Sequence, residues 1–160
     1  MLPALAHLLQ NLQPALTTIY GVPGSGKTCL CIHAALHFLT EGKKILFIDT
    51  EKGFSLERFQ QLAGEKYTTY LASLILFLPN SFKNQHEIIR QIPAIVNQGN
   101  IALVIVDTIG YHYRRFVKNR LELGNTMLIH QMNVLEQISK KIPVIVSNQV
   151  YSSVSDNTVK

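Results

Sequence analysis

Long hydrophobic runs, charged residues and cysteines are all scarce in this chain of 160 residues. The longest apolar stretches, around Leu74–Leu78 and Ile101–Val106, fall far short of the ~18 residues that a membrane-spanning helix requires. No positive side chain precedes Lys27, so the basic region that opens a secretory signal peptide is missing. We therefore expect a cytoplasmic protein with no membrane partner.

Cysteine occurs only at Cys29 and Cys31. Residues two apart on a helix point about 200° apart, so the two side chains cannot share a disulfide or a metal. We interpret both as buried free thiols. His33 and His37 lie on the same helix face as Cys29, but no fourth ligand is evident, and a neutral helix surface is the better interpretation.

The composition is that of a folded globular domain. Charged residues make up 16% of the chain and apolar residues 47%, which argues against disorder. We expect one domain over residues 1–150, with 151–160 as a polar tail. The 15 basic and 10 acidic residues leave a formal charge of +5, a mild excess that suggests an anionic partner.

Apolar runs alternate with amphipathic stretches along the chain. The runs predict strands at Thr17–Tyr20, Lys44–Asp49, Leu74–Leu78, Ile101–Asp107 and Ile142–Ser147. The stretches between them predict helices at Lys27–Leu39, Ser55–Ala63, Asn84–Asn97 and Thr126–Lys140. This order favours an α/β sandwich of three layers, a mainly parallel sheet with helices on both faces. We expect Pro93 to kink or end the third helix.

The strongest motif is GVPGSGKT, which follows a predicted strand and opens a predicted helix. It fits the phosphate-binding P-loop pattern at every fixed position. Glycines let successive N–H groups point inward at phosphate oxygens, and the helix N-terminus adds positive potential. In this pattern Lys27 reaches the β and γ phosphates, and the Thr28 hydroxyl ligates Mg²⁺. We expect ATP to be held by Gly21, Val22, Pro23, Gly24, Ser25, Gly26, Lys27, Thr28 and Cys29.

Acidic and amide residues stand at the carboxyl ends of three other strands. Asp107 ends the strand ALVIVD, where an acid can hold Mg²⁺ through water, although a helix-capping turn has the same pattern. Asp49 and Glu51 follow the second strand; a carboxylate there can polarise the attacking water, or both can be ordinary loop acids. Gln149 follows the last strand, where an amide can sense a γ-phosphate or belong to a turn.

In this order and at these separations, the pieces resemble the RecA/RadA recombinase superfamily, most closely its archaeal RadB branch. The resemblance runs from about Leu16 to Tyr151 and is carried by IYGVPGSGKT, FIDTEKGFSLERFQQLA, ALVIVDTIGYHYR and KIPVIVSNQV. It implies that Glu51 activates water and that Gln149 senses the γ-phosphate. It also implies that Arg58 and Gln61, one helical turn apart, flank the adenine.

The stretch Gly110–Gly124 aligns with the first DNA-binding loop of that superfamily. Its basic side chains are interleaved with aromatic ones, which suits the phosphates and stacked bases of single-stranded DNA. The residues expected to contact DNA are Tyr113, Arg114, Arg115, Lys118 and Arg120. The alternative is a solvated connecting loop whose tyrosines pack on the sheet.

The sequence also departs from the pattern of the superfamily. The glycine-rich turn before the first strand is missing, and residues 151–160 match only the start of the second DNA-binding loop. We therefore expect the C-terminal strands of the family sheet to be absent, which would place the P-loop strand at an uncovered edge. No polymerisation motif is evident ahead of the core, so the oligomeric state stays open.

These features predict the ATPase core of a recombination or repair protein that binds Mg·ATP and single-stranded DNA, with slow hydrolysis. The alternative is a nucleotide-switched accessory module that serves a recombinase or other repair protein with negligible hydrolysis. A small-molecule kinase on the same scaffold is a third reading. It is disfavoured because no arginine-rich lid follows Asn84–Asn97.

Overall fold

The computed structural model describes residues 11–150, so the predicted tail at 151–160 lies outside the described part. The strands are β1 (Leu16–Gly21), β2 (Lys44–Asp49), β3 (Leu74–Phe77), β4 (Ile101–Asp107) and β5 (Val144–Gln149). The helices are α2 (Lys27–Thr40), α3 (Leu56–Ala63), α4 (Tyr67–Leu71), α5 (Phe82–Gly99), α6 (Tyr111–Phe116) and α7 (Leu121–Ser139), with a 3-10 turn, η1, at Gly64–Lys66. Every helix within 11–150 is too short or too polar to cross a membrane.

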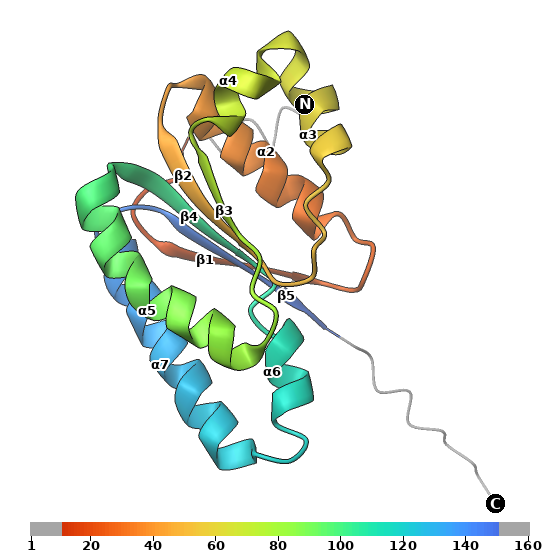
Figure 1. Cartoon of the computed structure of the whole chain (residues 1–160), viewed down its shortest axis with the longest axis vertical. Helices are drawn as coiled ribbons and strands as arrows, with labels where there is room; N and C mark the ends of the chain where they lie inside the picture. The colour runs from red at the N-terminus through yellow and green to blue at the C-terminus, as the bar shows by residue number, and fades with distance from the viewer. Residues whose placement is uncertain (1–10, 151–160) are drawn as a thin grey trace, which may run out of the picture.

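The five strands form one parallel sheet in the order β1-β5-β4-β2-β3 (Figure 1). This confirms the predicted α/β class and the mainly parallel sheet of about five strands. The P-loop strand, β1, is an edge strand of the described sheet, as expected. All carboxyl ends of a parallel sheet meet at one edge, which brings the polar residues that follow β1, β2, β4 and β5 together.

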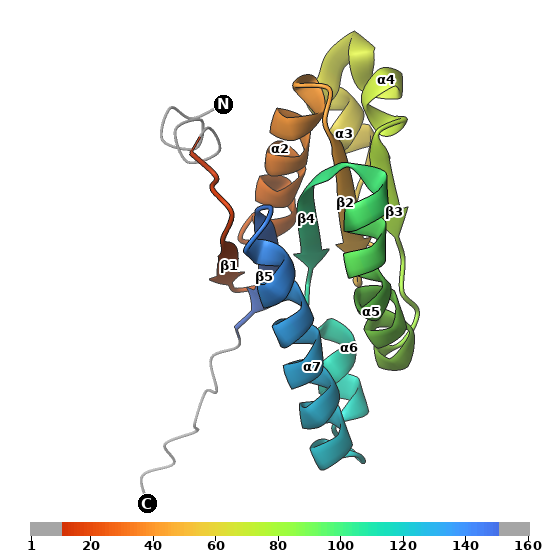
Figure 2. The same cartoon turned by 90° about the vertical axis from the view of Figure 1, so that its left-hand side faces the viewer.

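Side chains of the central strands alternate between two separate cores. Ile45 and Phe47 of β2 pack with α2 and α3, whereas Leu46 and Ile48 pack with α5 and α7. Figures 1 and 2 show the resulting layers, with α2, α3 and α4 on one face of the sheet and α5 and α7 side by side on the other. Because both faces are covered, β2 and β4 are apolar along nearly their whole length.

Helix α5 confirms the predicted helix over Asn84–Asn97 and extends it at both ends. It passes through Pro93, which therefore does not end it, and continues to Gly99, where Asn100 in a left-handed conformation caps it. Ile89 and Ile92 are fully buried beside the proline, and this packing offsets the lost backbone hydrogen bond. Helix α7 begins at Leu121 rather than Thr126, so the chain before it is shorter and more ordered than expected.

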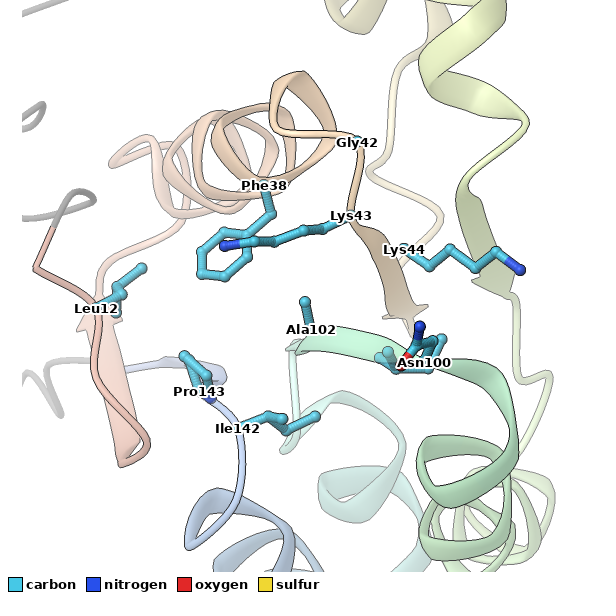
Figure 3. Close-up of a pocket in the computed structure, with 10 residues that line it drawn as sticks. Leu12, Phe38, Gly42, Lys43, Lys44, Asn100, Ala102, Ile142 and Pro143 are labelled. Carbon is cyan, nitrogen blue, oxygen red and sulfur yellow. The ribbon is translucent and has the colours of Figure 1, made fainter.

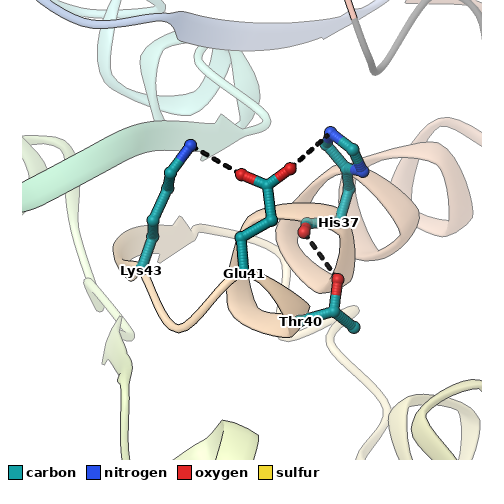
Figure 4. Close-up of polar contacts among 4 residues, drawn as sticks. All are labelled: His37, Thr40, Glu41 and Lys43. Carbon is teal, nitrogen blue, oxygen red and sulfur yellow. Dashed lines mark hydrogen bonds and ion pairs between the residues drawn. The ribbon is translucent and has the colours of Figure 1, made fainter.

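The turn between α2 and β2 carries a small ionic cluster (Figure 4). Glu41 accepts a hydrogen bond from Lys43 Nζ at 2.6 Å and lies 3.7 Å from His37 Nε2. The Lys43 contact holds the pKa of the Glu41 carboxyl below its ordinary value. The cluster is exposed to solvent, so it fixes the shape of the turn more than it adds stability.

His86 of α5 faces His130 of α7, with ring centroids 5.1 Å apart. Burial lowers the pKa of His86 below its ordinary 6.5, and positive charge on His130 and Arg90 lowers it further. A hydrogen bond to the Met127 carbonyl and the charge of Glu87 act in the opposite direction. The unfolded chain therefore binds this proton more readily than the folded chain does.

We expect the stability contributed by neutral His86 to be complete above its ordinary pKa and to fall as the pH drops through 6.5 toward the lowered value. The substitution His130→Asn should move the pKa of His86 upward, toward 6.5, because it removes the repulsion from His130 while burial remains. An NMR titration of the His86 ring protons measures this shift. An unchanged His86 pKa in His130→Asn would show that His130 does not contribute to it.

Candidate functional site

The P-loop joins β1 to α2 along one tight backbone path. Gly24 and Gly26 have φ values of 76° and 88°, in the left-handed region that favours glycine. Gly26 is also the residue that caps the N-terminus of α2. The backbone therefore requires glycine at these two of the three glycine positions in the motif. Helix α2 directs the unpaired N–H groups of its first turn at the loop.

Lys27, the first residue of α2, is nearly buried, with 8% of its surface exposed. Its ammonium group donates hydrogen bonds to the carbonyl of Gly21 at 3.0 Å and to that of Val22 at 2.8 Å. The lysine thus folds back over its own loop, which holds a positive charge inside the concave P-loop.

Glu51 lies across a cavity of roughly 420 Å³ from the P-loop. Its Oε1 accepts a hydrogen bond from the Thr108 hydroxyl at 2.7 Å. The Gln149 side-chain N–H₂ group donates to both carboxylate oxygens, at 2.9 Å each. The residues lining the cavity are Pro23, Gly24, Gly26, Lys27, Thr28, Glu51, Gly53, Thr108 and Gln149. The structure therefore places the predicted loop, acid and amide around one space.

Gln149 is the last residue of β5, not a residue beyond it. The predicted strand was too short at its carboxyl end, since β5 runs from Val144 to Gln149. Gln149 pairs in register with Gly21, the first residue of the P-loop motif, and the N–H of Val150 donates to the Gly21 carbonyl at 3.2 Å. The sheet itself thus positions this amide beside the loop.

The two strand-end aspartates have different partners. Asp107 is buried, and its carboxylate accepts a hydrogen bond from the Ser147 hydroxyl of the neighbouring strand. Asp49 accepts hydrogen bonds from the backbone N–H groups of Gly53 and Phe54, at 3.0 and 2.9 Å. Asp49 therefore shapes its loop, which agrees with the interpretation that it is an ordinary loop acid. Glu51, two residues later, faces the cavity instead.

Sequence reasoning missed Thr50 and Thr108. The Thr50 hydroxyl donates to the Thr108 carbonyl at 2.7 Å and accepts from the Thr108 N–H at 2.9 Å. These bonds join the carboxyl ends of β2 and β4, where Asp49 pairs in register with Asp107. The repeated Asp-Thr pair at the end of both strands was the signal in the sequence that could have identified them.

Arg58 and Gln61 of α3 are neighbours, as their spacing predicts. One guanidinium nitrogen of Arg58 donates to Gln61 Oε1 at 3.4 Å, and another approaches Cys29 Sγ at 3.9 Å. Cys31 is buried, and burial raises the pKa of its thiol well above the ordinary value. Cys29 is only half-buried, so the prediction that both thiols are buried is wrong for Cys29. Its sulfur faces α3 instead.

The donor set at the base of the cavity suits a hard divalent cation. Thr28 offers a hydroxyl and Glu51 a carboxylate to the cavity, and oxygen ligands of this kind are those that Mg²⁺ prefers. The predicted ligand Asp107 is buried at the end of β4 and is not among the residues that line the cavity. Among the described residues, no thiol or imidazole lines this cavity. The residues present therefore fit Mg²⁺ rather than a softer metal.

The segment Gly110–Gly124 is not a loop over most of its length. Residues Tyr111–Phe116 form helix α6, and α7 begins at Leu121. Aromatic packing explains the helix, because Phe82 of α5 lies 5.6 Å from the Tyr113 ring and 5.2 Å from the Phe116 ring. The Tyr113 hydroxyl also donates to Asn125 Oδ1 at 2.5 Å. Tyr113 thus packs against a helix, not against the sheet as the alternative interpretation had it.

The basic residues of this segment divide into two groups. Arg115, Lys118 and Arg120 are exposed, and the Arg120 guanidinium lies 5.9 Å from the Phe116 ring centroid. Arg114 is half-buried and donates to Gln149 Oε1 at 3.4 Å. The three exposed cations form a positively charged surface, whereas Arg114 contacts Gln149, which lines the P-loop cavity.

A larger cavity, of roughly 560 Å³, lies at the opposite end of the sheet (Figure 3). Lys44 and Ile101, among its lining residues, are the first residues of β2 and β4. Open α/β sheets bind ligands at the carboxyl ends of their strands. None of the predicted site residues lines this larger cavity, so the smaller one at the P-loop is the candidate site.

Comparison with known proteins places the chain among proteins of recombination and repair. The sequence pattern of the Rad51 family matches residues 9–160. The "DNA repair and recombination protein RadB" of Methanococcoides burtonii is 37% identical over 153 residues, covering 90% of this chain and 65% of the relative. That of Methanoculleus marisnigri is 39% identical over 152 residues, covering 91% and 66%. That of Thermococcus kodakarensis is 43% identical over 141 residues, covering 85% and 61%. The chain thus spans slightly less than two thirds of these relatives.

Proposed function

The chain belongs to the Rad51 family, and on that premise we propose that it is the ATPase core of a recombination or repair protein that binds Mg·ATP and single-stranded DNA. The observation that carries the proposal is the convergence of the P-loop, Glu51 and Gln149 on one cavity. We assign the core to residues 1–150. The relatives are about half as long again as this chain. That this chain shares their activity is therefore a proposal.

The chain's own residues supply the parts that phosphoryl transfer requires. The P-loop N–H groups and Lys27 bind the β and γ phosphates and stabilise the charge that develops on them. Thr28 would hold Mg²⁺ directly and Asp107, at the end of β4, would hold it through water; the bound ion would neutralise phosphate charge. Glu51 orients a water molecule and accepts its proton as the water oxygen bonds to the γ-phosphorus. The bond from the γ-phosphorus to the bridging oxygen breaks, and ADP and phosphate leave.

Two further groups complete the proposed sites. Arg58 and Gln61, joined by their hydrogen bond and beside Cys29, form the flank on which the adenine lies. The exposed cations Arg115, Lys118 and Arg120 bind the DNA backbone by ionic contacts. The sequence also predicts that Tyr113 contacts DNA. Because its ring packs on Phe82, we propose instead that Tyr113 stabilises α6.

The test of this function is phosphate release from Mg·ATP by the 160-residue chain, titrated with single-stranded DNA. We expect slow turnover that DNA accelerates, and a loss of about 10²-fold or more in Glu51→Gln, because this change removes the proton acceptor. Glu57→Gln is a matched control, since it removes an exposed carboxylate from α3. Turnover that survives in Glu51→Gln would remove Glu51 from the mechanism.

One observation favours the accessory-module alternative. The Glu51 carboxylate already accepts hydrogen bonds from Thr108 and Gln149, so it is less free to accept a proton. In the module, ATP binding would alter the Gln149 contact and signal to a recombinase or other repair protein without turnover. Tight binding of Mg·ATP together with no phosphate release, with and without DNA, is the result that selects this reading.

A further inference from the structure

Thr108, the residue after the end of β4, has a backbone that is fixed from both sides. Its N–H donates to the Thr50 hydroxyl oxygen at 2.9 Å, and its carbonyl accepts from the same hydroxyl at 2.7 Å. Before it, the Asp107 carbonyl accepts from the Thr50 N–H at 2.8 Å. After it, the Ile109 N–H donates to the Ser147 carbonyl of β5 at 3.0 Å. The Thr108 side chain therefore projects from a rigid position.

The Thr108 hydroxyl is a hydrogen-bond donor with a set direction. The side chain is branched at Cβ, which restricts its rotamers, and only 2% of the residue is exposed. Thr108 lines the P-loop cavity, and its hydroxyl donates to Glu51 Oε1 at 2.7 Å. A hydroxyl carries one proton, so this donor is committed to Glu51.

Glu51 depends on side-chain contacts for its position. It lies two residues beyond the end of β2 and is half-buried, and Lys52 after it is exposed and has a φ of 57°. A glutamate side chain is long, so holding its carboxylate in one place is costly in entropy. Among the described residues, only Thr108 and Gln149 donate hydrogen bonds to this carboxylate.

These hydrogen bonds are divided unequally between the two carboxylate oxygens. Oε1 of Glu51 accepts from Thr108 and from Gln149, whereas Oε2 accepts from Gln149 alone. Each oxygen of an ionised carboxylate has about two lone-pair sites. Both sites of Oε1 are therefore filled, and one lone pair remains on Oε2.

We propose that Thr108 is a positioning residue for hydrolysis, whose hydroxyl holds Glu51 Oε1 and leaves Oε2 to accept the proton of the attacking water. This inference rests on the proposed ATPase function and adds two residues to it, because Thr50 fixes the backbone from which Thr108 projects. As the water oxygen bonds to the γ-phosphorus, one water proton passes to Oε2, and the bond from the γ-phosphorus to the bridging oxygen breaks.

The test measures phosphate release from Mg·ATP by the full chain in the presence of single-stranded DNA. Thr108→Val keeps the branched shape and the backbone bonds to Thr50, and removes only the hydroxyl. We expect kcat to fall about tenfold, a factor typical for a hydrogen bond to a charged group, and the Kd for Mg·ATP to stay within about twofold of the wild-type value. Thr108→Ser retains the hydroxyl and should restore most of kcat.

Thr126→Val is the matched control. It also removes a threonine hydroxyl that donates one hydrogen bond, to the Glu122 carbonyl at 3.0 Å. Thr126 lies on α7 and is not among the described residues that line the cavity. Its kcat should equal that of the wild type.

Thr50→Val tests the support behind Thr108. The N–H and carbonyl of Thr108 lose their shared partner, so we expect both the thermal midpoint and kcat to fall. A lower midpoint with an unchanged kcat would remove Thr50 from the proposal and leave it a purely structural residue.

The remaining outcomes separate the two proposals. If Thr108→Val turns over ATP as fast as the wild type or faster, while Lys27→Ala is inactive, the ATPase assignment stands and the role of Thr108 is wrong. A fall in kcat that Thr108→Ser does not restore, or that comes with an equal loss of Mg·ATP affinity, also overturns the role. If neither the wild type nor Thr108→Val exceeds Lys27→Ala, hydrolysis and the role of Thr108 are both overturned.

Discussion

Lys27→Ala is expected to weaken the binding of Mg·ATP by about 30-fold or more, because truncation of a buried, hydrogen-bonded charge costs about 2–5 kcal/mol. The ammonium group is held inside the P-loop by the carbonyls of Gly21 and Val22. It therefore lies at the proposed phosphate site, and no other lysine is among the described residues that line this cavity. Isothermal titration calorimetry with Mg·ADP and Mg·ATP measures the loss.

Lys43→Ala is the control for this experiment. Lys43 is exposed and lies at the opposite end of the sheet, where it pairs with Glu41. Its removal takes away the same charge and should leave the affinity for nucleotide unchanged. Retained affinity in Lys27→Ala would contradict the assignment of the P-loop as the nucleotide site, whatever the turnover.

Phe47→Ala is expected to lower the free energy of unfolding by about 3–5 kcal/mol, which is the usual cost of deleting a buried phenylalanine ring. Phe47 is fully buried in β2 and makes an edge contact with Phe54, at 5.4 Å between ring centroids. Urea unfolding followed by circular dichroism measures the change.

Tyr20→Ala is the matched control, because Tyr20 is an aromatic strand residue that is 74% exposed. Its free energy of unfolding should stay within about 0.5 kcal/mol of the wild-type value. A loss in Phe47→Ala no larger than that in Tyr20→Ala would mean that this core relaxes around the missing ring. The packing described for the α2 face would then be wrong.

The central part of the fold was predictable because local and tertiary preferences agree there. The bounds of β2 and β4 match the prediction residue for residue. Both strands are buried on two faces, so each reads as a continuous apolar run, and each run ends at a buried aspartate, Asp49 or Asp107. The P-loop was predictable for a related reason, since its glycines adopt backbone conformations that other residues avoid.

The basic segment could not be predicted from its own residues. Tyr111–Phe116 becomes helical because Phe82, about thirty residues earlier in the chain, packs on Tyr113 and Phe116. A contact of that sequence separation leaves no local pattern. The inward position of Arg114 has the same origin, because its partner Gln149 comes from a different strand. Helix α5 continues past Pro93 for a similar reason, since burial of Ile89 and Ile92 against the sheet offsets the backbone hydrogen bond that the proline cannot make.

The reciprocal bonds between Thr50 and Thr108 divide the site into a fixed part and a part that can rearrange. They join β2 to β4 where Glu51 and Asp107 leave the sheet. Opening this junction would break two buried hydrogen bonds at once, so its amides belong to the slowest-exchanging unit of the domain. Any rearrangement that accompanies a ligand must therefore begin on the β5 and α6 side. The two aspartate–threonine strand ends thus form the stationary frame of the site.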